Sequence, residues 1–241
     1  MITSASWLFM AYIFSDDTIP LHDVVDKKKY IFCTPEPFHK VFCCFGDYFT
    51  ETDTCADMHY DASGIGRIHK KGVPSSLCIS SPFPQNSTYT LDIQNPSPLA
   101  ICAGVTLDGE TLYAYDPDTT YQLVEKEVYD DCLFTKFTCT LKNGLSFNKT
   151  CTLSDSGVEI VIDGNENLEL LFPVFDFDGK EHTEIQLSGK ELILKYHGHE
   201  CKFTASELIS DKNEVYANRN GHYKKFAVSG KNKLSLKIEM K

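Results

Sequence analysis

Hydrophobic and polar residues alternate along most of this chain with the two-residue period of half-buried β-strands. The clearest example is the pair of runs 133–141 and 145–153, which flank Lys142-Asn143-Gly144. Asn-Gly is the strongest short signal for a tight hairpin, and Asp108-Gly109 predicts a second hairpin between 99–107 and 110–115. Turn signals recur about every eight to twelve residues, a spacing typical of an antiparallel sandwich. The pattern therefore predicts an all-β chain.

Two further hairpins follow from glycine-containing turns. Asp163-Gly164-Asn165 predicts a turn between strands 158–162 and 168–172, and Ser188-Gly189-Lys190 predicts one between 185–187 and 192–196. Shorter apolar runs rich in aromatic and β-branched residues complete the predicted set: 30–33, 40–45, 77–80, 88–93, 201–204, 214–217, 223–228 and 234–238. We therefore expect residues 29–241 to form one large antiparallel multi-strand β-sandwich of the supersandwich type.

The N-terminal segment has a different pattern. Residues 3–14 are almost wholly apolar, and Trp7, Met10, Ala11 and Phe14 follow helical spacing, so residues 1–28 are predicted to be a short helix and a linker. Twelve residues are too few to span a bilayer as a helix, which needs about 20. No basic residues precede the run and no clear cleavage site follows it, so the pattern does not favour a signal peptide.

Composition restricts the partners of the chain. Its 241 residues carry a formal net charge of −11, which argues against nucleic acid and anionic membranes as general partners. The 42% of hydrophobic residues suffices for a packed core. Ten cysteines form no C-x-x-C pair, and most stand in apolar runs. We read most of them as buried free thiols in a reducing compartment, the cytoplasm, with a disulfide framework in an exported protein as the alternative.

Positive charge gathers in one stretch, residues 57–74. Gly64 and Gly66 allow a sharp turn or a close approach, and basic residues follow directly. In an extended segment Arg67, His69 and Lys71 share one face, where they could bind a carboxylate or a sulfate. The alternative is a solvated turn in which Arg67 pairs with a nearby aspartate. Neither a dinucleotide nor a P-loop fingerprint fits this stretch, and no cofactor is expected.

The same stretch holds candidates for proton transfer. Elimination beside a uronate carboxylate needs a base, an acid and a group that neutralises the carboxylate. His59 and Tyr60 could transfer the protons, and Arg67 or His69 could neutralise the carboxylate; a purely structural role for His59 and Tyr60 is the alternative. Glycoside hydrolysis would instead need two spaced carboxylates, and several acidic residues qualify equally: Asp47, Glu51, Asp53, Asp57 and Asp61.

A metal site is not predicted. His197, His199 and Cys201 would share one face of a strand, as zinc ligands could. However, three ligands so close on one strand rarely converge on one ion, and Gly198 suggests a turn that breaks the alternation. We therefore assign no metal ligands.

The segment 38–84 carries a family resemblance. It contains Phe-His-Lys-Val-Phe at 38–42, Gly-Asp-Tyr-Phe at 46–49 and His-Tyr-Asp-Ala-Ser-Gly-Ile-Gly-Arg-Ile-His-Lys-Lys-Gly-Val-Pro-Ser at 59–75. This segment resembles the start of the β-sandwich domain of heparinase II/III-like enzymes, and the closing run 216–226 fits a last-strand arrangement of such a domain. Those enzymes pair an N-terminal α/α toroid with a C-terminal sandwich.

The resemblance implies a part of a polysaccharide lyase or glycoside hydrolase that acts on acidic oligosaccharides or polysaccharides in a cleft between toroid and sandwich. Residues 3–14 would be the last helix of a toroid that is otherwise largely absent, so the chain is not expected to be active alone. The basic stretch would face the cleft. The alternatives are a non-catalytic carbohydrate-binding module, with Tyr113, Tyr115 and Tyr121 as a sugar platform, and a structural sandwich.

Overall fold

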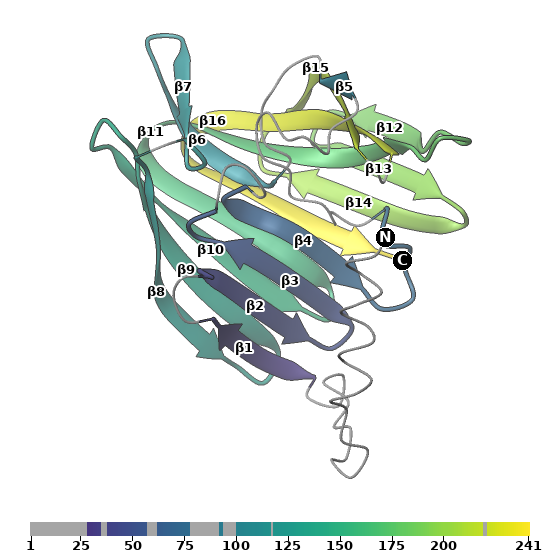
Figure 1. Cartoon of the computed structure of the whole chain (residues 1–241), viewed down its shortest axis with the longest axis horizontal. Helices are drawn as coiled ribbons and strands as arrows, with labels where there is room; N and C mark the ends of the chain where they lie inside the picture. Colours follow the sequence, from purple (N-terminus) through teal and green to yellow (C-terminus); the bar gives the residue numbers. More distant parts are fainter. Residues whose placement is uncertain are drawn as a thin grey trace, which may run out of the picture.

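The computed structural model describes residues 28–34, 38–56, 62–77, 92–93, 100–116, 118–218 and 221–241. These residues form strands and turns, with no helix among them, so the predicted all-β class is confirmed. The strands of the described part are β1 Lys29–Cys33, β2 Lys40–Phe45, β3 Tyr48–Asp53, β4 Gly64–Lys70, β5 Asp92–Ile93, β6 Cys102–Leu107, β7 Glu110–Tyr113, β8 Thr120–Val128, β9 Cys132–Thr140, β10 Ser146–Ser154, β11 Gly157–Phe177, β12 Glu184–Ser188, β13 Glu191–Tyr196, β14 His199–Ala205, β15 Ile209–Asn218 and β16 Gly221–Met240 (Figure 1).

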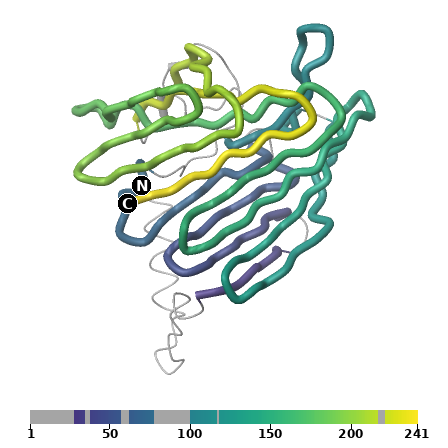
Figure 2. Tube along the Cα trace, turned by 180° about the vertical axis from the view of Figure 1, so that it is seen from behind, coloured from purple at the N-terminus to yellow at the C-terminus, as the bar shows by residue number. Residues whose placement is uncertain are grey.

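The strands form two antiparallel sheets. The small sheet has the order β1-β2-β3-β4, and the main path of the large sheet runs β12-β13-β14-β16-β11-β10-β9-β8. Strands β5, β6, β7 and β15 pair beside that path. The small sheet covers the part of the large sheet made by β8–β11, and Figure 2 shows the same two layers from behind. The predicted multi-strand sandwich is therefore present.

The core lies between the two sheets because alternate side chains of each strand point inward. In β9 and β10 the buried positions alternate strictly with half-buried or exposed ones. Phe137 of β9 is 1% exposed, and Ile65 and Ile68 of β4 are fully buried on the facing sheet. Burial of one such side chain contributes roughly 1.5–3 kcal/mol, so this alternation holds the layers together.

Several predicted turns are confirmed. Asp108 and Gly109 join β6 to β7 with φ angles of 51° and 85°, the left-handed pair that a type I′ hairpin turn requires. The hairpin through Asn143-Gly144 joins β9 to β10, as the sequence predicted. The hairpin through Gly189 joins β12 to β13.

The turn predicted at Asp163-Gly164-Asn165 is wrong. The chain passes through it as one strand, β11, and the two predicted strands 223–228 and 234–238 likewise merge into β16. β11 and β16 pair along almost their whole length, with an irregularity between Asp163 and Asn167. A bulge absorbs the turn-forming residues there, because a continuous ladder satisfies more backbone hydrogen bonds than two separate hairpins would.

The nine described cysteines are all free, and five are buried: Cys43, Cys102, Cys139, Cys151 and Cys201. Burial raises the pKa of the Cys43 thiol to about 12. These buried thiols act as small apolar side chains, as the sequence predicted. Among the described residues no helix is long and apolar enough to cross a membrane. The helix predicted within 3–14 and the predicted strand residues 78–80 and 88–91 lie outside the described residues.

Candidate functional site

The candidate site lies on β3 and β4 of the small sheet. Glu51 pairs with Arg67 and Thr52 pairs with Ile65, so Gly66 is an extra residue that forms a β-bulge. The bulge shifts the alternation by one position. Ile65 and Ile68 consequently both point into the core, although they stand three positions apart. Arg67 lies on the outer face, which is the face of the small sheet turned away from the large one.

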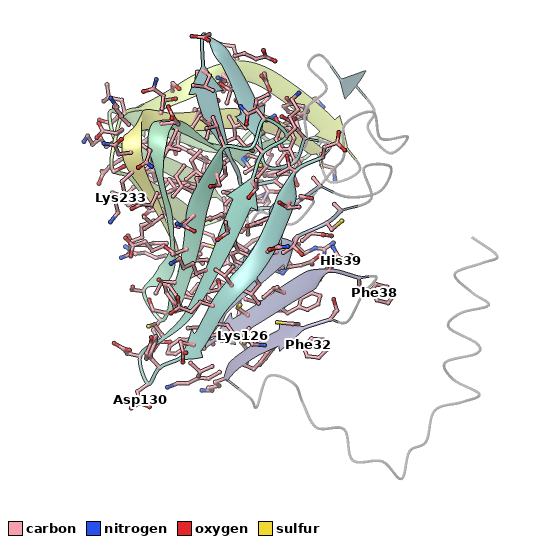
Figure 3. All side chains as sticks on the ribbon, turned by 90° about the vertical axis from the view of Figure 1, so that its left-hand side faces the viewer. Phe32, Phe38, His39, Lys126, Asp130 and Lys233 are labelled. Atoms are coloured by element: carbon pink, nitrogen blue, oxygen red, sulfur yellow. The ribbon has the colours of Figure 1, made fainter. Side chains whose placement is uncertain are left out.

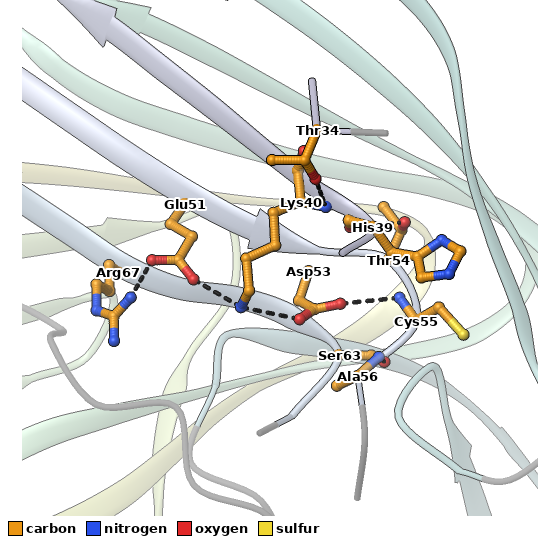
Figure 4. A network of polar contacts seen from close by, with 10 residues as sticks. All are labelled: Thr34, His39, Lys40, Glu51, Asp53, Thr54, Cys55, Ala56, Ser63 and Arg67. Atoms are coloured by element: carbon orange, nitrogen blue, oxygen red, sulfur yellow. Dashed lines mark hydrogen bonds and ion pairs between the residues drawn. The ribbon is translucent and has the colours of Figure 1, made fainter. Parts of the chain in front are cut away.

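Arg67 is engaged by an acidic partner. Its guanidinium forms an ion pair with the carboxylate of Glu51, whose side chain is only 4% exposed. Lys40 of β2 bridges the same carboxylate at 2.8 Å and that of Asp53 at 2.9 Å (Figure 4). A buried carboxylate is costly unless it is paired, so two cations are needed beside these two acids. The sequence left open that Arg67 pairs with an acid, and among the described residues the structure shows such a pair with Glu51.

Three hydrogen bonds fix the chain on either side of residues 57–61. Cys55 donates its backbone N–H to Asp53 at 2.9 Å, and Ala56 donates its backbone N–H to the Ser63 hydroxyl at 3.1 Å. The Thr54 N–H bonds the carbonyl of His39 at 3.0 Å. The residues before this segment are therefore held by Asp53 and His39, and the Ala56–Ser63 bond joins its two flanks. The proposed proton-transfer residues His59 and Tyr60 lie outside the described residues.

A pocket of about 350 Å³ opens at the other end of β4. Its wall holds two of the predicted substrate-binding residues, His69 and Lys71, together with the aromatic rings of Tyr30, Tyr48 and Phe49. Arg67 does not line this pocket. The structure therefore brings His69 and Lys71 together and gives Arg67 a separate role in the ion network.

His69 is half-buried in this pocket. Burial lowers the pKa of its imidazole below the ordinary 6.5, the nearby Arg67 cation lowers it further, and the Glu51 carboxylate partly opposes both. Its Nε2 atom is buried and has no hydrogen-bond partner among the described residues. A neutral imidazole carries one hydrogen-bond donor and one acceptor on its ring, so an unpartnered nitrogen leaves part of that capacity unused. The exposed ammonium of Lys71 can bind an anionic group beside it.

A row of rings crosses the outer face of the small sheet. Phe32 stacks on Phe42 at 6.2 Å, Phe42 on Phe49 at 6.0 Å, and Phe49 contacts His69 at 6.2 Å between ring centroids. Phe32 projects away from the large sheet (Figure 3). Sequence reasoning missed this row and the Lys40–Asp53 pair, since only the strand register brings these residues together. The rings stack on one another, so they offer their edges, rather than open faces, to a ligand.

A larger hollow of about 710 Å³ lies between β1 and the β10–β11 turn. Four aspartates and two lysines line it: Asp47, Asp130, Asp131, Asp155, Lys28 and Lys29. Its excess of carboxylates would repel an acidic glycan. Among the described residues, no group of histidine, cysteine and acidic side chains is arranged to bind a metal ion.

Two other sites considered from the sequence, a histidine–cysteine set and a tyrosine platform, do not form. His197 lies in a turn with a φ of 50°, while Cys201 is fully buried in the core, so the histidine–cysteine set does not share a face. Two of the three tyrosines considered as a sugar platform are buried, and Tyr113 is half-buried. Tyr115 is 8% exposed and Tyr121 is 5% exposed, and the Tyr113 hydroxyl bonds Glu169. The platform interpretation was therefore wrong, because two of its three rings pack in the core.

Comparisons with known proteins identify structures of similar fold. No family model matches the chain, and no curated protein matches it in sequence. The heparan sulfate lyase HepC from Pedobacter heparinus covers 99% of the chain with a TM-score of 0.59 and 10% identity. A heparinase III gene product covers 87% with a TM-score of 0.55 and 10% identity. The 4-alpha-glucanotransferase from Thermococcus litoralis covers 89% with a TM-score of 0.50 and 6% identity.

The matched part is a minority of each of those proteins. The chain covers 41% of the heparan sulfate lyase, 36% of the heparinase III and 40% of the glucanotransferase. Identities this low show the fold alone. The resemblance predicted from the sequence is thereby confirmed as one of fold, and the chain corresponds in architecture to a part of heparinase III and of the heparan sulfate lyase.

Proposed function

We propose that this chain is the β-sandwich part of a carbohydrate-active enzyme, of polysaccharide lyase or glycoside hydrolase type, that acts on acidic glycans and is not active alone. The observation that carries this proposal is the pocket in which His69 and Lys71 lie beside aromatic rings. Lys71 would bind a carboxylate or sulfate of the glycan, and the half-buried rings of Tyr30 and Phe49 would contact its sugar. The similar fold of a heparan sulfate lyase supports the same substrate class.

The network at Asp53 gives the proposal a second site element. It holds Cys55, which precedes residues 57–61, and a bond from Ala56 to Ser63 joins the two flanks of this segment, which carries His59 and Tyr60. In the proposed reaction, His59 and Tyr60 transfer the protons, while His69 stabilises the substrate carboxylate. A helical toroid is the proposed partner that closes the cleft. We propose a cytoplasmic location, and the nine free cysteines of the described part support a reducing compartment.

Binding of acidic oligosaccharides tests the proposed pocket. Lys71→Ala and His69→Ala should each weaken binding of a heparan sulfate oligosaccharide by about tenfold, the effect of one lost charge-assisted hydrogen bond. Lys195→Ala is the matched control, because Lys195 is an exposed lysine on β13, distant in sequence from the pocket. If both pocket variants bind as tightly as the unmodified chain does, the pocket is not the glycan site.

Catalysis is tested separately, in a protein that joins this sandwich to a helical toroid. Ultraviolet absorbance of the unsaturated uronate product reports elimination, and new reducing ends without that absorbance report hydrolysis. His59→Ala and Tyr60→Phe should each lower turnover by at least about a hundredfold, the usual contribution of a general acid or base. Full activity in both variants would remove these two residues from the mechanism.

A further inference from the structure

The large sheet carries a polar groove where β6, β11 and β16 run side by side. Asn167 of β11 is the register partner of Thr106 on one side and of Lys231 on the other. The groove has a volume of about 440 Å³, within the range of roughly 300–1,000 Å³ that small-ligand sites occupy. Its hydrogen-bonding side chains come from four strands: Thr106, Thr111, Asn167, Glu169, Ser229 and Lys231.

Glu169 gives the groove a fixed wall. The residue is 7% exposed, yet its carboxylate accepts hydrogen bonds from Tyr113 of β7 and from Ser229 of β16, the latter at 3.1 Å. The ammonium of Lys212, on β15, lies 3.3 Å from the same carboxylate. Donors on three different strands hold this carboxylate in one orientation and compensate its charge. The groove is therefore pre-organised, and its wall is electrically neutral.

The remaining groups of the groove can bind a polar ligand. The Thr106 and Thr111 hydroxyls lie 2.8 Å apart, so one donates to the other, and their oxygens can accept hydrogen bonds from a ligand. Asn167 is exposed and offers both a donor and an acceptor, and Ser229 can accept while it donates to Glu169. Lys231 is exposed at the rim and adds a positive charge in a chain of net charge −11.

From this chemistry we infer that the groove is a second saccharide-binding site, which takes one sugar unit bearing a sulfate or a carboxylate. Adjacent hydroxyl groups of the sugar match the row of threonine, asparagine and serine side chains. The anionic substituent matches Lys231. No aromatic ring lines the groove, so an apolar ligand would find little to pack against. The residues differ from those of the His69–Lys71 pocket, so this inference stands or falls separately from the proposed function.

Backbone amide shifts in the isotopically labelled full chain test the inference, with a sulfated disaccharide derived from heparan sulfate as the probe. Shifts should appear at Thr106, Thr111, Asn167 and 229–231. Lys231→Ala should weaken this binding about tenfold and Thr111→Val about threefold, as for one charged and one neutral hydrogen bond. Lys233→Ala is the matched control, since Lys233 is an exposed lysine two residues further along β16 that does not line the groove.

Two further arms separate the remaining outcomes. His69→Ala together with Lys71→Ala should leave the groove shifts unchanged, even where the pocket shifts disappear. The desulfated disaccharide should bind several-fold more weakly, and inorganic sulfate more weakly still. Equal binding by sulfate alone would reduce the groove to an anion site and overturn the inference. Absence of groove shifts at millimolar disaccharide, or equal losses in Lys231→Ala and Lys233→Ala, would overturn it as well.

Discussion

Replacement of Gly64 by alanine should separate the small sheet from the large one more effectively than other glycine replacements do. Gly64 has a φ of +122°, and a Cβ atom placed there would lie 2.6 Å from the backbone oxygen of Ile101. The same oxygen accepts the Ile65 N–H at 3.1 Å and faces the ammonium of Lys149 at 3.3 Å. The Ile65–Ile101 bridge joins β4 to the chain that enters β6. A methyl group at position 64 would therefore clash with the Ile101 carbonyl, which the Ile65–Ile101 bridge holds in place.

The magnitude follows from two terms. A non-glycine residue held in such a conformation costs about 1–3 kcal/mol. Displacement of the Ile101 carbonyl weakens one or two hydrogen bonds at about 0.5–1.5 kcal/mol each, which brings the expected loss to about 1.5–6 kcal/mol. Gly72→Ala is the matched control: its φ is +84°, but no atom lies within 4 Å of the added Cβ. It should cost only the backbone term, about 1–3 kcal/mol.

Equilibrium unfolding in urea, followed by far-ultraviolet circular dichroism, measures the free energy of unfolding of both variants. The difference between Gly64→Ala and Gly72→Ala isolates the close approach to Ile101, because both variants share the left-handed backbone. Equal midpoints and equal slopes for the two variants would refute the reasoning that this junction limits the stability of the sandwich. A changed slope for Gly64→Ala alone would show that the sheets unfold separately.

Three further predictions follow from the buried charges. Burial lowers the pKa of Lys149 below its ordinary 10.5, so the free energy of unfolding of the wild-type chain increases as the pH rises toward that value. Lys149→Met should therefore be more stable than the wild type at pH 7, and urea unfolding should show that this advantage shrinks by pH 10. Glu51→Gln leaves Lys40 and Arg67 short of an acid and should cost about 1–3 kcal/mol, measured in the same way. Nuclear magnetic resonance should show His69 titrating below 6.5 and lower still in Glu51→Gln, whereas a titration at 6.5 or above would contradict its burial.

The hairpins were predictable because they depend on neighbouring residues. Asp108-Gly109 and Asn143-Gly144 encode their turns locally, and the alternation on either side encodes which face is buried. The turn predicted at Asp163-Gly164-Asn165 was wrong because the conformation of these residues depends on β16, some 70 residues away. That strand pairs with β11 on both sides of them. Local propensity was overridden there by long-range pairing.

The candidate site was predictable only in part, for the same reason. The sequence places Arg67, His69 and Lys71 together, and His69 and Lys71 do share a pocket. It does not show that Glu51 faces Arg67 across β3 and β4, nor that Lys40 reaches both acids from β2. Lys149 is the opposite case: it occupies an inward position of β10 where the alternation predicts an apolar side chain, and it is buried as the period requires.

The bulge at Gly66 allows β4 to bury two isoleucines and still keep Arg67 out of the core. Without an extra residue, strict alternation would set Ile65, Arg67 and His69 on one face and turn Ile68 to the other. One of the two isoleucines would then face solvent, and if Ile65 faced the core, the guanidinium of Arg67 would enter the core with it. The bulge lets Ile65 and Ile68 both fill the core while Arg67 meets Glu51 outside. The cationic face therefore depends on the extra residue in β4 as much as on its own charges.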